Sequence, residues 1–241
     1  MTNTLHSFGC SFSEHFLERL ENSYLNHDVL NSYLELYKRD DLKSWHEYIS
    51  NDLNLELNIQ GHSGGSNYQI FESLCNSVDK FKENDIIIVE WSYVNRFRLS
   101  GEDSENWTPI LSNHSEHSFI DKESLNKILY LRETKNQYKN EIISYMNIIN
   151  SLCDSKNIKV FYWTIDHMLF NYFYDNNHIN DSWLFFDKHS SNFNYVEFIL
   201  NNGGLKIEDE VNHKDPHFGI AGNKIFGELS NDYIKNYLKI S

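Results

Sequence analysis

Two short segments at opposite ends of the chain carry side chains that together could perform nucleophilic catalysis. Ser11 lies within Phe8–Ser13, just after a glycine that permits a tight turn. Asp215 and His217 lie near the other end, and Pro216 between them stiffens the loop. A serine hydroxyl is a weak nucleophile unless a base removes its proton, and a carboxylate must hold the tautomer of that base. The residue types therefore predict a Ser11–His217–Asp215 triad.

Other chemistries are open to neighbouring residues. Cys10 would be the nucleophile if the turn presented it in place of the serine, but we expect its side chain to point into the core. Metal sites could be built from His213 with His217, or from His114 with His117; Pro216 disfavours the helix that the first pair would need. The cysteines form no Cys-x-x-Cys pair. We expect no metal and no other cofactor.

The apolar pattern indicates which elements would position these residues. Strands are predicted at 5–9, 55–59, 85–91 and 158–163, and helices at 45–53, 70–78, 142–152 and 225–238, with a further helix from Phe16. Strands that alternate with helices imply a parallel sheet covered on both faces. We therefore expect a three-layer α/β/α sandwich, flavodoxin-like, with a mainly parallel sheet of about five strands. Sites in such folds lie at the carboxyl ends of strands, where Ser11 is found.

The order of the motifs resembles that of the SGNH (GDSL-like) hydrolase family. Gly9–Ser13 is similar to the Gly-Asp-Ser-x-Ser nucleophile block, and Asp215–Asn223 is similar to the C-terminal Asp/His block. Asn58 and Gly64–Asn67 resemble the second block, whose glycine lends a backbone N–H to the oxyanion hole. The resemblance implies the SGNH hydrolase fold and a serine esterase or acylhydrolase. It also implies Gly64 as an oxyanion donor, with Asn67 beside it as a substrate-binding candidate.

Two blocks depart from the family pattern. Cys10 stands where the family has an aspartate that is not part of the triad. The third block, normally Gly-x-Asn-Asp, is replaced by Glu90–Arg96, so that either Asn95 or Ser92 would supply the side-chain oxyanion donor. Arg96 would bind an anionic group of the substrate or pair with Glu90.

Composition narrows the class of partner. The net charge of −14 opposes binding to nucleic acid and to anionic lipid, and no apolar run is long enough for a membrane span. Without a recognisable signal peptide we expect a cytoplasmic protein. We expect a small-molecule or carbohydrate ester as substrate. A catalytically impaired binding protein for a glycan or a partner, or an O-acyltransferase that uses the same triad, remain alternatives, and the oligomeric state is not indicated.

The 241 residues are expected to form one domain, 1–241, with insertions at about 21–44, 99–137 and 166–213. The last insertion is rich in aromatic residues, which would either line a cleft or pack onto the core. We favour core packing for most of them. These aromatic residues are Phe170, Tyr172, Phe173, Tyr174, Trp183, Phe185 and Phe186.

Overall fold

The computed structural model describes residues 2–22, 27–62, 64–94, 96–100, 107–110 and 136–240, together with residues 123, 127 and 130. For residues 22, 27, 97–100 and 107–110 the description covers the backbone alone. Most of the predicted insertion at 99–137, with His114 and His117, lies outside this part of the chain, and so does Asn95.

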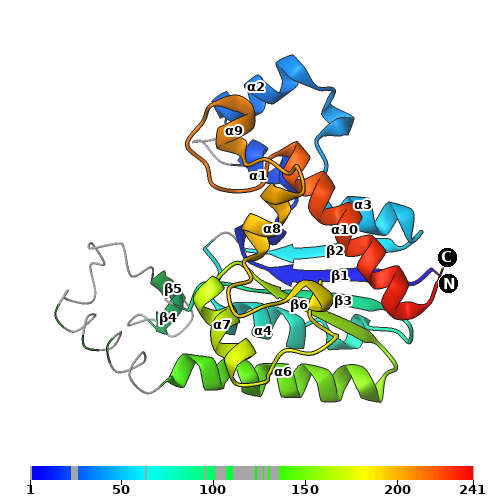
Figure 1. Cartoon of the computed structure of the whole chain (residues 1–241), viewed down its shortest axis with the longest axis vertical. Helices are drawn as coiled ribbons and strands as arrows, with labels where there is room; N and C mark the ends of the chain where they lie inside the picture. Colours follow the sequence, from blue (N-terminus) through cyan, green and yellow to red (C-terminus); the bar gives the residue numbers. More distant parts are fainter. Residues whose placement is uncertain are drawn as a thin grey trace.

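Four parallel strands form the central sheet in the order β2-β1-β3-β6 (Figure 1). They are β1 (Thr4–Gly9), β2 (Glu56–Gly61), β3 (Ile86–Trp91) and β6 (Lys159–Thr164). Every residue of β1 and β3 is buried, as expected for central strands that are covered on both faces. The chain leaves β1 toward one edge of the sheet and reaches β3 on its other side, so the order of strands reverses between these two. Crevices at such reversals are the usual ligand sites of parallel sheets.

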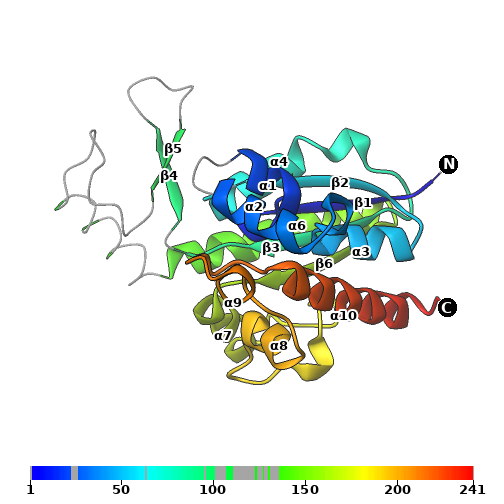
Figure 2. The ribbon, with the colours of Figure 1, turned by 90° about the horizontal axis from the view of Figure 1, so that it is seen from above.

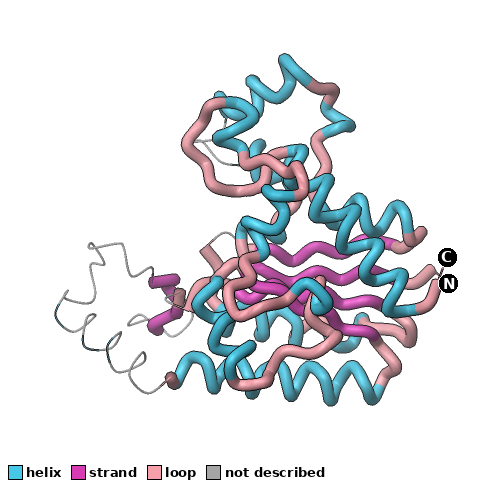
Figure 3. The backbone as a smooth tube through the Cα atoms, in the orientation of Figure 1, coloured by secondary structure: helices cyan, strands magenta, loops and turns pink. Residues whose placement is uncertain are grey.

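Helices cover both faces of the sheet (Figure 3). Successive residues of a strand point to opposite faces, and β6 shows which helices lie on each. Trp163 packs edge-on against Trp45 of α3 (Trp45–Asp52) and contacts Phe226 of α10 (Ile220–Leu238). The neighbouring Tyr162 donates a hydrogen bond of 2.8 Å to Asn150 of α6 (Gln137–Ser155) on the other face. The α4 helix (Asn67–Cys75) lies beside α6.

The predicted three-layer α/β/α architecture is therefore confirmed, with one correction to the sheet. It has four strands in the described part of the chain rather than about five. The fifth position, beside β6, is held by an isolated parallel bridge between Tyr162 and Trp183. The pairing consists of two backbone hydrogen bonds: the N–H of Tyr162 donates to the carbonyl of Ser182 at 2.8 Å, and the N–H of Leu184 donates to the carbonyl of Tyr162 at 2.9 Å. The chain turns away after Leu184.

Segments that the sequence suggested as long insertions contain helices of their own. The remaining elements are α1 (Phe16–Asn22), α2 (His27–Leu36), α7 (His167–Asp175), α8 (Tyr195–Asn201), α9 (Ile207–Val211), the antiparallel hairpin β4 (Phe97–Ser100) and β5 (Trp107–Ile110), and four short 3-10 turns, η1 (Ser11–Ser13), η2 (Arg39–Asp41), η3 (Val78–Lys80) and η4 (Phe186–Lys188). Figure 2 shows that the hairpin projects from the end of the sheet opposite the chain termini.

The aromatic residues of the third insertion mostly complete the core. Phe170, Phe173, Trp183 and Phe185 are 0–3% exposed and belong to the main hydrophobic cluster. Tyr174 and Phe186 are exposed at the surface. None of the described helices is both long and apolar enough to cross a membrane.

Candidate active site

Ser11 lies in the 3-10 turn η1, directly after the carboxyl end of β1. The turn is closed by a hydrogen bond of 3.0 Å from the N–H of Ser13 to the carbonyl of Cys10. The preceding Gly9 has to lack a side chain, because a Cβ there would collide with Ser13 and lie 2.5 Å from the Glu90 carboxylate. Ser11 is 6% exposed, so little of it is accessible to solvent.

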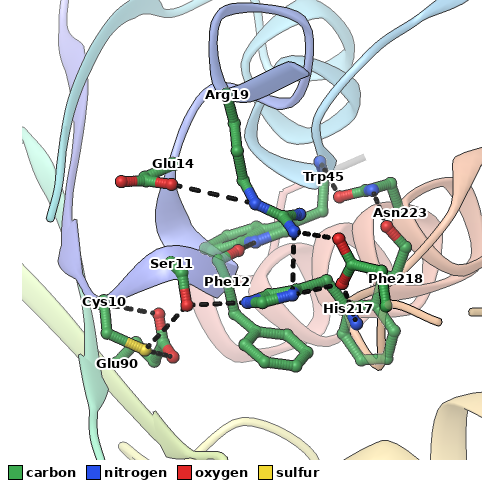
Figure 4. A network of polar contacts seen from close by, with 11 residues as sticks. Cys10, Ser11, Phe12, Glu14, Arg19, Trp45, Glu90, His217, Phe218 and Asn223 are labelled. Atoms are coloured by element: carbon green, nitrogen blue, oxygen red, sulfur yellow. Dashed lines mark hydrogen bonds and ion pairs between the residues drawn. The ribbon is translucent and has the colours of Figure 1, made fainter. Parts of the chain in front are cut away.

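Ser11, His217 and Asp215 form a continuous hydrogen-bonded chain. Figure 4 shows the contact between Ser11 and His217. The Nε2 atom of His217 lies 2.7 Å from Ser11 Oγ, and its Nδ1 atom lies 2.5 Å from Asp215 Oδ1. The same carboxylate oxygen accepts the backbone N–H of His217 at 3.0 Å. When Nδ1 carries the proton and donates it in the hydrogen bond to Asp215, Nε2 is free to accept the hydroxyl proton of Ser11.

The loop that carries Asp215 and His217 is fixed on both sides. Its carbonyls accept backbone N–H groups from the start of α9: Ile207 bonds to His217 at 2.9 Å and Glu208 to Asp215 at 3.2 Å. On the other side, the ring of Phe12 lies 4.3 Å from the His217 ring, centroid to centroid. Residues 206 sequence positions apart are thus held together by the folded backbone and not by a flexible link.

Arg19 of α1 also reaches this group, which sequence reasoning missed. Its Nη2 atom lies 2.5 Å from Asp215 Oδ2 and 2.8 Å from His217 Nδ1. The single in-plane position of Nδ1 cannot both donate to Asp215 and accept from Arg19. We assign the Nδ1 proton to the bond with Asp215 and the Arg19 proton to Oδ2, which satisfies both charges. The only feature of the sequence that could have indicated Arg19 is its position on a helix that starts five residues after Ser11, and this feature is not specific.

The surroundings of the histidine favour its neutral form, chiefly through burial. Burial lowers the pKa of His217, and the nearby charges of Arg19 and Arg96 lower it further, against the raising effect of Asp215. Burial alone would raise the pKa of Asp215, but the hydrogen bond from His217 and the charge of Arg19 hold it well below its usual range. At neutral pH the pair is therefore a neutral imidazole beside an ionised carboxylate, the state in which a histidine can act as a base.

The side chain of Cys10 points into the protein, as predicted, and its Sγ also lies 4.0 Å from Ser11 Oγ, which donates a hydrogen bond to it (Figure 4). Cys10 is fully buried, its Sγ donates to Glu90 Oε1 at 2.8 Å, and its N–H donates to Glu90 Oε2 at 3.1 Å. Burial raises the pKa of the Cys10 thiol to about 12, and burial raises the pKa of Glu90 to about 7. A thiol with this pKa holds very little of the thiolate that would be needed for attack.

The second-block residues lie beside the turn and have different structural roles. A hydrogen bond of 3.0 Å from the N–H of His62 to the carbonyl of Gly9 ties this loop to the end of β1. Gly64 has a φ of +68°, which favours glycine, and a Cβ there would meet nothing within 4 Å. Asn67 is a cross-link within the fold: its amide donates to the carbonyl of Ser92 at 3.0 Å and accepts the N–H of Ser92 at 2.7 Å.

The third-block residues follow β3, next to the Ser11 turn. Ser92 is fully buried, and its Oγ accepts a hydrogen bond of 3.1 Å from Arg96 Nη1. The guanidinium of Arg96 also lies over the ring of Tyr93, 5.0 Å from the centroid. Glu90 is not within ion-pair distance of Arg96, because its carboxylate is turned toward Cys10. The predicted Asn95 donor lies outside the described residues.

A small pocket opens at the serine, lined by Ser11, Phe12, Glu14, Phe16, Arg19, His217, Phe218 and Asn223. Within the described ranges, no three His, Cys, Asp or Glu side chains come together in a way that would hold a metal ion. Both ring nitrogens of His217 face Ser11 and Asp215, so its pairing with His213 around a metal would break this chain of contacts.

Comparison with known proteins gives little sequence similarity. No family model and no curated protein matches the chain. Among solved structures, the chain is similar to a protein from Desulfitobacterium hafniense DCB-2 assigned to the G-D-S-L family of lipolytic proteins. The two share 11% identity at a TM-score of 0.46, over 96% of this chain and 99% of the other.

Proposed function

We propose that this protein is a serine-dependent ester hydrolase, with Ser11 as nucleophile, His217 as general base and acid, and Asp215 as the carboxylate that orients it. The observation that carries the proposal is the unbroken contact from Ser11 Oγ to His217 Nε2, at 2.7 Å, and from Nδ1 to Asp215, at 2.5 Å. A capping serine would need no histidine at its hydroxyl, and a surface Asp-x-His pair would need no buried serine.

In the proposed reaction, His217 Nε2 takes the hydroxyl proton while Ser11 Oγ bonds to the ester carbonyl carbon. The resulting oxyanion is stabilised by the N–H groups of Ser11 and Gly64 and by one side-chain donor, Asn95 or Ser92. Collapse of this intermediate breaks the bond to the alcohol, which leaves with the proton from His217. Water, activated by the same histidine, then releases the acid from Ser11. Loss of one oxyanion donor typically costs about 10²–10³ in rate, so the identity of the third donor sets the efficiency.

The proposed substrates are small O-acyl esters or carbohydrate-linked esters. The pocket at Ser11 is small and is lined on one side by Phe12, Phe16 and Phe218, which suits a short acyl group better than a long chain. Most of the aromatic residues of the third insertion are buried in the core and so do not offer their rings to a long acyl chain.

The first test is hydrolysis of p-nitrophenyl acetate and butyrate by the wild type and by Ser11→Ala. We expect the variant to lose at least about 10³-fold in kcat, because the nucleophile and its base act as one unit. Ser13→Ala, in the same turn, is the matched control and should retain most of the activity. Circular dichroism would establish that all three proteins fold.

Equal rates for the wild type and Ser11→Ala would overturn the proposal and favour a binding protein with this fold. Transfer of the acetyl group to a sugar hydroxyl added to the assay, at the expense of hydrolysis, would instead identify the acyltransferase alternative. Labelling of Ser11 by a fluorophosphonate would support the nucleophile independently of the chosen ester.

A further inference from the structure

Arg96 is a cation near the Ser11 turn, and no carboxylate of the described residues lies within ion-pair distance of it. Arg19 pairs with Asp215, and the exposed Arg39 pairs with Glu21. Among the arginines with described side chains, Arg96 alone has no carboxylate within ion-pair distance. This is unexpected in a chain with 35 acidic and 21 basic residues, where acidic partners are abundant.

Arg96 lies beyond the carboxyl ends of β1 and β3, where the strand order reverses. Ser11 follows β1 and Ser92 follows β3, and these two strands are parallel neighbours with Phe8 opposite Val89. The N–H of Cys10, just after β1, donates a hydrogen bond to the Glu90 carboxylate of β3. The residues that follow the two strands therefore lie side by side. Arg96 is attached here through Ser92. Burial lowers the pKa of His217 and raises the pKa of Cys10 and of Glu90, and the positive charge of Arg96 acts to lower all three, which requires that it lie near each of them.

The known contacts of Arg96 use only part of its guanidinium. One nitrogen donates to Ser92, and the guanidinium carbon lies over the ring of Tyr93. A guanidinium carries five N–H donors in a planar fork that matches the two oxygens of a carboxylate or phosphate. The contacts with Ser92 and Tyr93 fix the orientation of the group while leaving most of the fork for a ligand. Because the side chain is half-buried, a bound anion would also offset the cost of its desolvation.

We infer that Arg96 is an anion-binding subsite, and that the natural substrate is an ester that carries a carboxylate or phosphate group close to the scissile bond. This inference rests on the proposed ester chemistry of Ser11 and adds the charge class of its substrate. The overall charge of −14 disfavours anions in general, so selectivity for an anionic ester has to come from a local cation such as this one.

Two pairs of esters would test the inference and locate the anion. Mono-4-nitrophenyl succinate against 4-nitrophenyl butyrate places the carboxylate on the acyl side, and 3-acetoxybenzoate against phenyl acetate places it on the alcohol side. In at least one pair, Arg96→Gln should lower kcat/KM for the anionic ester about 10- to 100-fold more than for the neutral one, as expected for loss of a charge-assisted contact. Arg96→Lys should restore part of the preference, and Arg39→Gln, which removes an exposed arginine, should change neither rate.

An equal loss for both members of each pair would overturn the inference, because Arg96 would then stabilise the oxyanion or the fold. Unchanged ratios in both pairs would overturn it too.

A binding experiment tests the anion subsite independently of the proposed ester hydrolysis. Monomethyl succinate and methyl phosphate should raise the melting temperature of Ser11→Ala, which cannot turn the ester over, and not that of Ser11→Ala/Arg96→Gln. If binding depends on Arg96 but no ester is hydrolysed, the subsite stands and the proposed reaction fails. If neither anion distinguishes the two variants, the subsite is wrong even when neutral esters are hydrolysed. The two anions also distinguish a carboxylate from a phosphate ligand.

Discussion

At the scale of single residues, the arrangement around His217 differs from a simple Ser-His-Asp chain by the presence of Arg19. The guanidinium contacts the carboxylate oxygen that the histidine does not use, 2.5 Å from Asp215 Oδ2. It therefore neutralises the charge of Asp215 that would otherwise raise the pKa of the imidazole. Arg19 is a positioning residue, because it acts on the reacting serine only through Asp215 and His217.

Arg19→Gln should move the acidic limb of the kcat/KM–pH profile to higher pH. His217 accepts a proton only when it is neutral, so activity falls as the pH drops through its pKa. That pKa is lowered by burial and by the charges of Arg19 and Arg96, and the charge of Asp215 opposes this. Removing Arg19 leaves the raising effect of Asp215 less opposed, so the histidine is protonated at a higher pH.

A structural role alone would not produce this shift. Arg19→Lys keeps the charge and should hold the limb near its wild-type position, and Arg39→Gln is the control for loss of an arginine. Glu14, which lies 3.9 Å from Arg19, is present in all variants. A profile for Arg19→Gln that falls in rate at every pH without moving its limb would contradict the assignment.

At this scale, residue type and order predict the motif residues but not their partners. Ser11, Asp215 and His217 were predicted from residue type and order, and they lie in contact; their catalytic role stays a prediction. Arg19 could not be predicted, because nothing in a helical Phe-Leu-Glu-Arg pattern indicates which distant carboxylate the arginine will meet. Asn67 shows the opposite case. It occupies a motif position, but its side-chain amide is hydrogen-bonded to the backbone of Ser92.

At the scale of elements, the loop with Asp215 and His217 depends on how the closing helix begins. Glu210 of α9 accepts the N–H groups of Ile220 at 2.7 Å and Ala221 at 2.6 Å, the first turn of α10. It also accepts the hydroxyl of Tyr33 from α2 at 2.6 Å. A carboxylate at a helix N-terminus satisfies otherwise unpaired donors and complements the helix dipole. One side chain thus joins α2, α9 and α10 directly after the site loop.

Glu210→Gln should lower the stability of the protein by about 1–3 kcal/mol, because a charged acceptor of three hydrogen bonds becomes a neutral amide with an NH₂ group facing donors. Urea denaturation followed by circular dichroism would measure the change. Glu228→Gln is the matched control: it lies on the exposed side of α10, 3.8 Å from Lys224, and should cost less than about 0.5 kcal/mol. Equal effects of the two substitutions would show that the cap contributes nothing specific.

The same elements show how far periodicity alone can predict the fold. The buried strands β1 and β3 and the long helices α6 and α10 were predicted, because each carries an apolar pattern with one clear period. Four shorter helices were not predicted, namely α2, α7, α8 and α9. They are 5–10 residues long, too short for a helical period to stand out in the sequence. The expected count of about five strands was too high for a related reason. The segment at Trp183 pairs with β6 through a single bridge and then turns away.

At the scale of the whole molecule, the described residues form two hydrophobic clusters of very different size. The larger has 32 buried residues around the sheet, and the smaller has eight, contributed by α1, α2, α9, the start of α10 and the loop at Leu42. In Figure 1 the helices α1, α2 and α9 stand together above the sheet. The Ser11 turn belongs to the sheet, whereas Arg19 lies on α1, so the site spans the two clusters.

The smaller cluster should therefore open before the sheet unfolds, and activity should be lost with it. Eight buried residues bury too little apolar surface to stay folded independently, so local opening costs less free energy than global unfolding. The four tryptophans whose side chains are described all belong to the larger cluster, so their fluorescence mainly reports on the sheet; they are Trp45, Trp91, Trp163 and Trp183. In urea, hydrolysis should fall at a lower concentration than the fluorescence changes, and amide hydrogens of α2 should exchange faster than those of β3. Leu20→Ala, which empties a fully buried position of the smaller cluster, should widen the separation, whereas coincident transitions and equal protection of α2 and β3 would show a single cooperative unit.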